Sequence, residues 1–391
     1  MLSLQQEGYI FSFKTARMIL VGNGAIEKIP EEVEKLSTKK PLIVTDKGIV
    51  TSGIVGKLTE VLEGSGIKVD ILDDVEAEPS TEFVSKCVRK VMDKGYDLII
   101  GLGGGSCMDV AKIISVMLTN GGSIYDYIGV EKIPKAGLPT ILIPTTSGTG
   151  SEVTPNAIVT NKKEQLKQGI VSHYLLPHLA VVDPSLTISL PAKLTAYTGM
   201  DALTHSIESY VSANASPLSD IVALESIRLI SRSLRNAVNN GGDIKARYDM
   251  SLGSLLGGIA LSNAGTGGVH ALAYPLGGRF GIPHGLANAL MLRYVIKFNI
   301  PGNPVKFARI AREMGEDVEG LSAEEAAKKA QEAVSKISDD VGIPKRLRDV
   351  GIPKEALAKL AESASKVSRL LANNPRQMRV EDIREIYEEA F

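Results

Sequence analysis

The stretch DLIIGLGGGSCMDVAK, residues 97–112, decides the fold class of this chain. It begins as a short apolar run rich in branched residues, which is typical of a buried strand, and passes through dense glycines into a segment with helical spacing. Such glycines let backbone N–H groups approach an anion closely, and the start of a helix favours negative charge. The stretch therefore predicts a strand, a diphosphate-binding loop and a helix.

The loop matches neither of the two common nucleotide-binding fingerprints. Ser106 stands where G-x-G-x-x-G, read from Gly101, would have its last glycine, and the G-K-[ST] ending of a P-loop is absent. From the residues alone, a nucleotide-binding loop and a simple tight turn are equal alternatives.

Strand and helix signals alternate on both sides of this stretch. Five short apolar runs are expected to form strands, at residues 41–45, 68–72, 97–101, 140–144 and 179–182. Amphipathic segments at residues 52–66 and 82–95 separate several of them, and this order predicts a parallel sheet with helices on both faces. Residues 11–24 precede the pattern and are expected to form a hairpin or an edge strand.

The character of the sequence changes after Pro184. Strand-like runs give way to helical patterns separated by Gly, Pro and Asn, such as the amphipathic residues 317–342. We therefore expect two domains with a boundary near residues 183–191. Residues 1–187 would form an α/β domain with a Rossmann-like parallel sheet, and residues 188–391 an all-helical domain.

Composition argues against several classes of partner. Lysine plus arginine number 44 and aspartate plus glutamate 45, and no long basic block occurs, so neither nucleic acid nor a membrane is an expected partner. No apolar run approaches the roughly 20 residues that span a bilayer, and the N-terminus lacks a secretory pattern. Cys87 and Cys107 give no disulfide framework; we interpret Cys107 as a small buried core residue, in preference to a thiol activated by a helix N-terminus. A cytoplasmic protein is expected.

Three of the five histidines fall in a set of metal-competent side chains, which comprises Asp201, His205, His270 and His284. The first two share one face of a predicted helix at i,i+4 spacing, and the last two lie on separate elements because glycines and a proline break the helix between them. One carboxylate and three imidazoles suit Fe(II) or Zn(II). A polar helix face is the alternative interpretation. The other two histidines, His173 and His178, are expected to be loop residues without a chemical role.

Two further features lie at the ends of predicted strands. The segment PTTSGTGSEVTP, residues 144–155, crowds hydroxyl groups onto a turn at the carboxyl end of a strand, where open α/β sheets bind ligands. Asp46 follows the first strand of the alternating pattern, where a carboxylate can accept hydrogen bonds from a ribose diol. A hydroxyl-capped turn and a surface aspartate are the respective alternatives.

Taken together, these segments resemble the iron-containing, or group III, alcohol dehydrogenases of the dehydroquinate synthase-like superfamily. The likeness runs from about residue 22 to residue 294, and the residues beyond it match only as a helical tail. It is most specific in GLGGGSCMDVAK, PTTSGTGSEVTP, VVDPSLTISLP, TGMDALTHSIESYVS, HALAYPLGG and PHG. The resemblance implies the two-domain fold of that superfamily.

The resemblance also implies roles for individual residues. The cofactor diphosphate would lie on Gly103, Gly104, Gly105, Ser106 and Asp109. The nicotinamide half would lie along Thr145, Thr146, Thr149 and Thr154. Lys167 would also touch the cofactor, Asp46 would favour NAD over NADP, and the four residues named above would hold the metal. Several members carry a proton-relaying histidine four positions after the third metal ligand; here Tyr274 stands there, and a phenol with an ordinary pKa near ~10 is a poorer base.

The expected reaction is reversible hydride transfer between a small primary alcohol or diol and NAD, giving an aldehyde, with Fe(II) or alternatively Zn(II) as Lewis acid. The resemblance also implies a homodimer. Alternatives on the same fold are a glycerol-type polyol dehydrogenase, a hydroxyacid–oxoacid transhydrogenase, and a dehydroquinate synthase, for which little beyond Arg279 supplies positive charge. A nucleotide-sensing or scaffold protein with a silent site is the alternative from another class.

Overall fold

The computed structural model describes residues 10–161 and 166–391. Its main sheet has six strands in the order β1-β9-β6-β4-β2-β3, and every neighbouring pair is parallel, as expected. The strands are β1 (Met18–Val21), β2 (Pro41–Val44), β3 (Asp70–Leu72), β4 (Leu98–Gly103), β6 (Thr140–Pro144) and β9 (Leu179–Val182). All five predicted strands are therefore present, with bounds that differ by a few residues.

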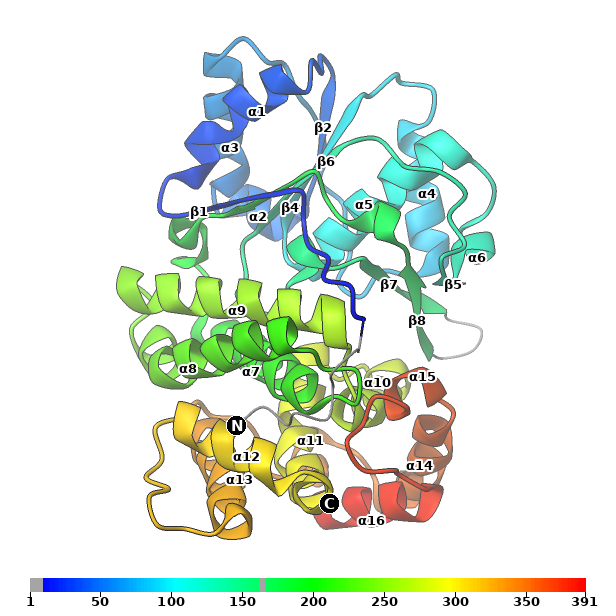
Figure 1. Ribbon diagram of the computed structural model, residues 1–391. Helices are drawn as coiled ribbons and strands as arrows, with labels where there is room; N and C mark the ends of the chain where they lie inside the picture. The colour runs from blue at the N-terminus through cyan, green and yellow to red at the C-terminus, as the bar shows by residue number, and fades with distance from the viewer. Residues whose placement is uncertain (1–9, 162–165) are drawn as a thin grey trace.

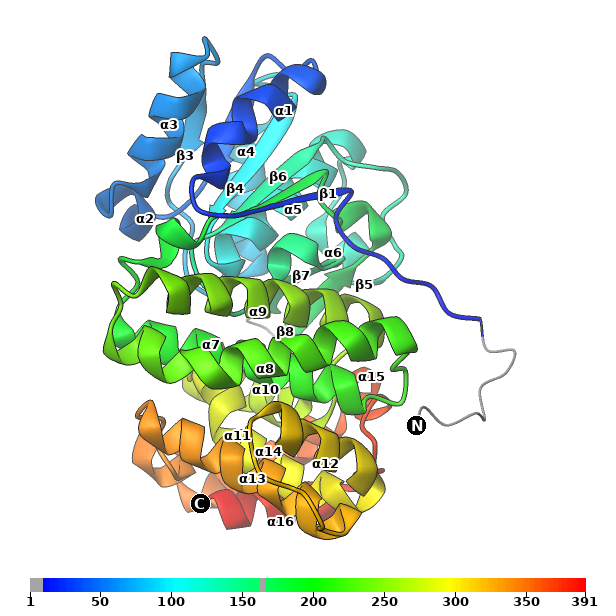
Figure 2. The ribbon, with the colours of Figure 1, turned by 60° about the vertical axis from the view of Figure 1, so that its left-hand side comes forward.

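Helices cover both faces of this sheet (Figure 2). They are α1 (Ile29–Lys35), α3 (Ile54–Gly64), α4 (Thr81–Val91) and α5 (Gly105–Asn120). Leu42 and Val44 of β2 pack in one apolar core with α4 and α5, whereas Ile43 between them packs in a second core with α1 and α3. Because successive side chains of a strand point to opposite faces, a strand buried on both faces has an unbroken apolar sequence.

The described chain after Val182 contains helices and no strand, so the all-helical prediction is confirmed. A short 3-10 helix, η5 (Pro184–Thr187), leads into α7 (Ala192–Val211), α8 (Pro217–Asn239), α9 (Ile244–Ala264), α10 (Gly268–Phe280), α11 (His284–Asn299), α12 (Pro304–Glu313), α13 (Ala323–Asp340), α14 (Leu357–Ser365), α15 (Ser368–Leu371) and α16 (Val380–Ala390). Helices α7, α8 and α9 form a layer next to the sheet. Helices α12, α13, α14 and α16 lie beyond this layer, on the side away from the sheet (Figure 1).

Two features differ from the sequence-based expectations or extend them. The N-terminal segment forms the edge strand β1, which pairs with β9, and not a hairpin. A second sheet of three strands was missed: β5 (Gly129–Val130), β8 (Leu166–Val171) and β7 (Asn156–Asn161). Polar residues interrupt the apolar ones in β7 (NAIVTN) and β8 (LKQGIV), so these strands lack the long apolar run that marks a buried strand.

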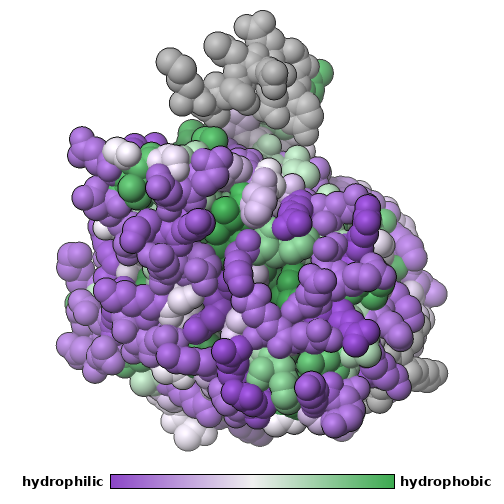
Figure 3. All heavy atoms as spheres, turned by 90° about the horizontal axis from the view of Figure 1, so that it is seen from below, coloured by the Kyte–Doolittle hydropathy of each residue, from purple (hydrophilic) through white to green (hydrophobic). Residues whose placement is uncertain are grey.

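Hydrophilic side chains dominate the face of the helical layers turned away from the sheet, with hydrophobic residues in separate groups (Figure 3). Within the described ranges, no helix combines the length and the apolar character needed to cross a membrane. The buried apolar side chains are instead gathered inside, in one large cluster of the helical half and in the two cores that flank the sheet.

Candidate active site

The four metal-competent side chains converge. The ligand atoms of Asp201, His205, His270 and His284 all lie within 4.8 Å of one another. The first two stand one turn apart on α7, the third lies in the first turn of α10, and the fourth is the first residue of α11. Asp201, His205 and His270 are buried and His284 is half-buried.

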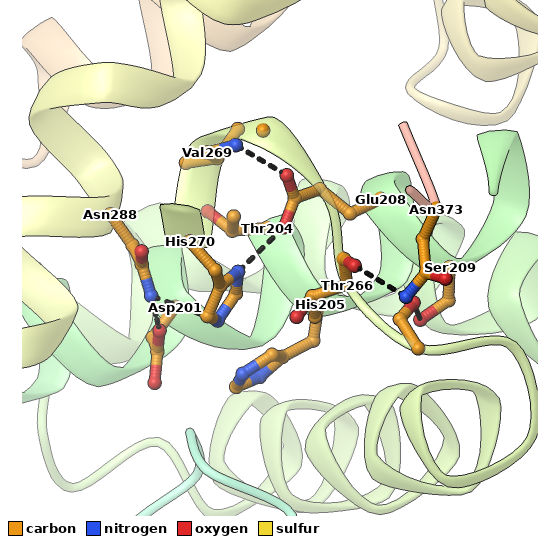
Figure 4. A network of polar contacts seen from close by, with 12 residues as sticks. Asp201, Thr204, His205, Glu208, Ser209, Thr266, Val269, His270, Asn288 and Asn373 are labelled. Atoms are coloured by element: carbon orange, nitrogen blue, oxygen red, sulfur yellow. Dashed lines mark hydrogen bonds and ion pairs between the residues drawn. The ribbon is translucent and has the colours of Figure 1, made fainter. Parts of the chain in front are cut away.

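Neighbouring groups fix the orientation of two of the imidazoles, and Figure 4 shows the contacts that hold His270. The Nδ1 atom of His270 lies 2.5 Å from Oε2 of the buried Glu208, whose Oε1 accepts a hydrogen bond from the backbone N–H of Val269 at 2.6 Å. The Nδ1 atom of His205 lies 3.2 Å from the carbonyl oxygen of Gly148. Both rings therefore engage the protein through Nδ1 and present Nε2 to the cluster, the arrangement typical of metal-binding histidines.

A buried amide, that of Asn288, contacts three of the four side chains of the cluster. The Nδ2 of Asn288 donates to Oδ1 of Asp201 at 2.6 Å and lies 3.1 Å from Nε2 of His270 and 3.2 Å from Nε2 of His284. Burial lowers the pKa of His205, and that of His284 well below its usual range, so both rings are neutral at pH 7 with a free lone pair. A buried carboxylate among neutral imidazoles calls for a compensating cation. The donor set fits Fe(II) or Zn(II).

The glycine-rich loop and the threonine-rich loop lie against each other. Strand β4 ends at Gly103, which has φ +146°, and a Cβ there would come within 2.7 Å of the Cys107 sulfur. A Cβ on Gly105 would come within 2.8 Å of the Thr149 side chain. Glycine is therefore required at both positions, and the backbone at the start of α5 stays open to a ligand.

One cavity of about 580 Å³ joins these loops to the metal-competent cluster. Among the residues singled out in the sequence, its lining includes Gly105, Ser106, Asp109, Thr149, Thr154, Lys167, His205, His270, Tyr274 and His284. Its lining does not include Asp46, Gly103, Gly104, Thr145, Thr146 and Asp201. The volume lies in the range typical of ligand and cofactor sites.

Several of the predicted cofactor residues already have protein partners. Asp109 accepts hydrogen bonds from the Ser151 hydroxyl at 2.6 Å and from the Ile158 backbone N–H at 2.9 Å, so it ties α5 to the loop and to β7. Asp46 caps the N-terminus of α2 (Lys47–Thr51) by accepting from the Ile49 backbone N–H at 3.0 Å. Both carboxylates therefore have a structural role.

The remaining cysteine and histidine predictions concern residues outside the cluster. Cys107 is a buried core residue. Burial and the nearby Asp46 raise the pKa of its thiol by more than the backbone of Gly104, at the start of α5, lowers it. His173 pairs with Glu131 at 2.8 Å, and Nδ1 of His178 lies 3.5 Å from the Arg17 guanidinium.

Sequence reasoning missed three residues of the site: Glu208, Asn288 and Glu78. Glu208 stands three residues after His205 and Asn288 four after His284, so helical spacing could have found both. Glu78 lies in the loop before α4, where no spacing relates it to the site.

Comparisons with known proteins agree with this geometry. Residues 16–184 match the family model described as iron-containing alcohol dehydrogenase, and residues 195–391 match the Fe-containing alcohol dehydrogenase family, C-terminal. The chain is 47% identical over 374 residues to long-chain-alcohol dehydrogenase 1 of Geobacillus thermodenitrificans (strain NG80-2), covering 95% of this chain and 94% of the relative. It is 41% identical to 1,3-propanediol dehydrogenase of Citrobacter freundii, covering 98% and 99%.

A crystal structure of 1,3-propanediol oxidoreductase superposes with a TM-score of 0.95 at 41% identity, covering 98% of this chain and all of the other. An alcohol dehydrogenase from Oenococcus oeni gives a TM-score of 0.95 at 38% identity, with the same coverage. Matches of this extent, in sequence and in structure, show that the chain belongs to the iron-containing alcohol dehydrogenase family.

Proposed function

We propose that this metal-dependent alcohol dehydrogenase transfers hydride between a small primary alcohol or diol and NAD, giving the aldehyde, with Fe(II) or Zn(II) held by Asp201, His205, His270 and His284. The observation that carries the proposal is that three of these donors, His205, His270 and His284, line the same cavity as Gly105 and Ser106 of the glycine-rich loop. Relatives named for long-chain alcohols and 1,3-propanediol support an alcohol or diol substrate. A relative named NAD-dependent methanol dehydrogenase supports the cofactor.

Different residues would bind the metal, hold the cofactor and orient the substrate. When bound, a divalent cation would act as a Lewis acid that lowers the pKa of the alcohol hydroxyl and polarises the aldehyde carbonyl. The backbone at the start of α5 would hold the diphosphate, because helix N-termini favour anions. The Tyr274 hydroxyl, which lines the cavity beside His270 and His284, would donate a hydrogen bond to the substrate oxygen. Hydride transfer thus depends chiefly on positioning across the cavity.

We also propose that residues 1–187 form the cofactor domain and residues 188–391 the metal domain, and that the protein is a cytoplasmic homodimer. β1 is an edge strand, and side chains of the N-terminal segment such as Ile10 and Val21 are exposed. An edge strand beside exposed apolar residues is a ready surface for a second copy.

An assay of alcohol-dependent NADH release tests the proposed function. Protein stripped of metal with a chelator is expected to be inactive and to regain activity when Fe(II) or Zn(II) is added without oxygen, across a panel of primary alcohols and diols. Equal NADH release by the stripped protein would contradict the metal-dependent mechanism. Oxidation that requires an added oxoacid, without release of free NADH, would indicate a transhydrogenase.

Asp46 is expected to select NAD over NADP. The Asp46→Ser variant removes the carboxylate that would repel a 2′-phosphate and keeps a side chain that caps α2. We expect the ratio of kcat/KM for NADP to kcat/KM for NAD to rise by about tenfold or more, which corresponds to ~1.4 kcal/mol. Steady-state kinetics with both cofactors measure it, and an unchanged ratio would mean that Asp46 only caps the helix.

Tyr274 is expected to orient the substrate and not to carry protons. Burial raises the pKa of its phenol above the ordinary value, so the group stays protonated throughout the neutral range. The Tyr274→Phe variant should therefore keep the shape of the pH–rate profile while kcat falls by less than about tenfold, the cost of one hydrogen bond. A lost or shifted limb in the profile would restore Tyr274 as a proton donor.

A further inference from the structure

Glu78 contacts residues of the cavity lining that come from both halves of the chain. Its Oε1 accepts from Nζ of Lys167 at 2.8 Å and from the backbone N–H of His284 at 3.2 Å. Its own backbone N–H donates to the Ser106 hydroxyl at 3.1 Å, and its carbonyl accepts from the Thr160 hydroxyl at 3.1 Å. One residue thus joins the glycine-rich loop, the small sheet and the first residue of α11.

The backbone of Glu78 is held in an unfavourable conformation. Its φ is +51°, in the left-handed region that glycine adopts without cost, and Pro79 follows directly, which disfavours this conformation further. Residues kept in such conformations concentrate at functional sites, where the surroundings impose them. Glycine would relieve this strain but would lose the contacts that the Glu78 side chain makes with Lys167 and His284.

The carboxylate of Glu78 lies between two positive groups. Lys167 is buried, with 6% of its side chain exposed, and Glu78 is its ion-pair partner. The second group is the N-terminus of the 16-residue helix α11, whose free N–H groups favour negative charge. The first lies on β8, next to the predicted cofactor residues, and the second begins with the predicted metal ligand His284.

We propose that Glu78 couples dinucleotide binding to metal binding, an inference that rests on the function proposed above. A cation held by His284 would fix the start of α11. It would thereby also fix the backbone N–H group that donates a hydrogen bond to the Glu78 carboxylate. Glu78 then fixes its own loop and, through its backbone N–H, the Ser106 hydroxyl of the glycine-rich loop. Each ligand therefore orders part of the other's site. Since coupling between two sites is reciprocal, NAD must tighten metal binding by the factor by which the metal tightens NAD binding.

Calorimetry on the full chain tests this coupling. The dissociation constant of NAD⁺ is measured for metal-free protein and for protein loaded with Zn(II), and the ratio of the two gives the coupling factor. We expect a factor of about ten in the wild type, within the usual range for coupled sites. In the Glu78→Gln variant, which keeps the size and an acceptor oxygen but loses the charge, the factor should fall to within about twofold of one.

Two further variants make the outcome unambiguous. Glu76→Gln removes an exposed carboxylate two residues earlier in the same loop and should keep the wild-type factor. Glu78→Gly relieves the backbone strain, which protects folding, and should lose the coupling as Glu78→Gln does. A wild-type factor of one, or an unchanged factor in both Glu78 variants, overturns the proposal while metal and NAD still bind. If the wild type binds neither ligand, the proposed function itself fails and the coupling with it.

Discussion

In the His270→Ala variant we expect metal binding and alcohol oxidation to be lost together. His270 supplies Nε2 to the cluster and is held through Nδ1 by the buried Glu208. Its removal takes away one of four donors and leaves the Glu208 carboxylate buried without its partner, which is unfavourable. Loss of a Lewis acid worth several kcal/mol lowers turnover by about 10³-fold or more. Metal analysis and NADH release, measured on the same preparation, give the two quantities.

The matched control is His173→Ala, which removes a half-exposed histidine that pairs with Glu131 outside the cluster. This variant should keep wild-type metal content and turnover. Circular dichroism of both variants establishes that they are folded. A folded His270→Ala protein that retains a full equivalent of metal and wild-type turnover would contradict the assignment of this ligand.

The second large effect is expected at Lys112, whose ammonium is buried in α5. It donates to the carbonyl oxygens of Thr154 at 3.0 Å and Asn156 at 2.8 Å and lies 3.8 Å from Asp109. Burial lowers its pKa to about 8, which leaves the group protonated at pH 7. Lys112→Met keeps the apolar stem but removes the donor to two buried carbonyls and the cation beside the buried Asp109 carboxylate, at a cost of about 3–5 kcal/mol in the free energy of unfolding.

Urea denaturation at pH 7 measures this cost as a lower midpoint at an unchanged slope. NAD⁺ binding should weaken as well, because the Lys112 ammonium holds the end of the threonine-rich loop. Lys57→Met, a change at an exposed lysine of α3, should stay within about 0.5 kcal/mol of the wild type. A Lys112→Met protein whose stability lies within about 1 kcal/mol of the wild type would show that the buried charge is dispensable.

Much of the fold follows from the sequence because burial leaves a pattern in it. Strand β2 is covered on both faces, so Leu42, Ile43 and Val44 are all apolar and the strand is visible as an unbroken run. Strand β8 belongs to a small sheet at the cavity and carries Lys167, which pairs with Glu78; Lys167 and Gln168 interrupt its apolar residues, so no apolar run marks it. The order of the strands depends on contacts between distant segments, which no local pattern contains.

The candidate site shows the same limit. Histidine is rare in this chain, so a shared helix face and two isolated histidines were enough to single out four donors. Glutamate and asparagine are common on helices, so spacing alone makes Glu208 and Asn288 candidates, and their roles depend on partners from other helices: Val269 and His270 of α10 for Glu208, and Asp201 of α7 for Asn288. The role of Glu78 depends on a backbone conformation and on four tertiary contacts, none of which the sequence displays.

X-ray absorption at the metal edge, on protein reconstituted with Fe(II) or Zn(II) and freed of excess metal, tests the central claim most directly. The account predicts one ion per chain, surrounded by nitrogen and oxygen donors at about 2.0–2.2 Å with the scattering signature of several imidazoles. A spectrum that shows water oxygens alone, or protein that retains no metal, would contradict it.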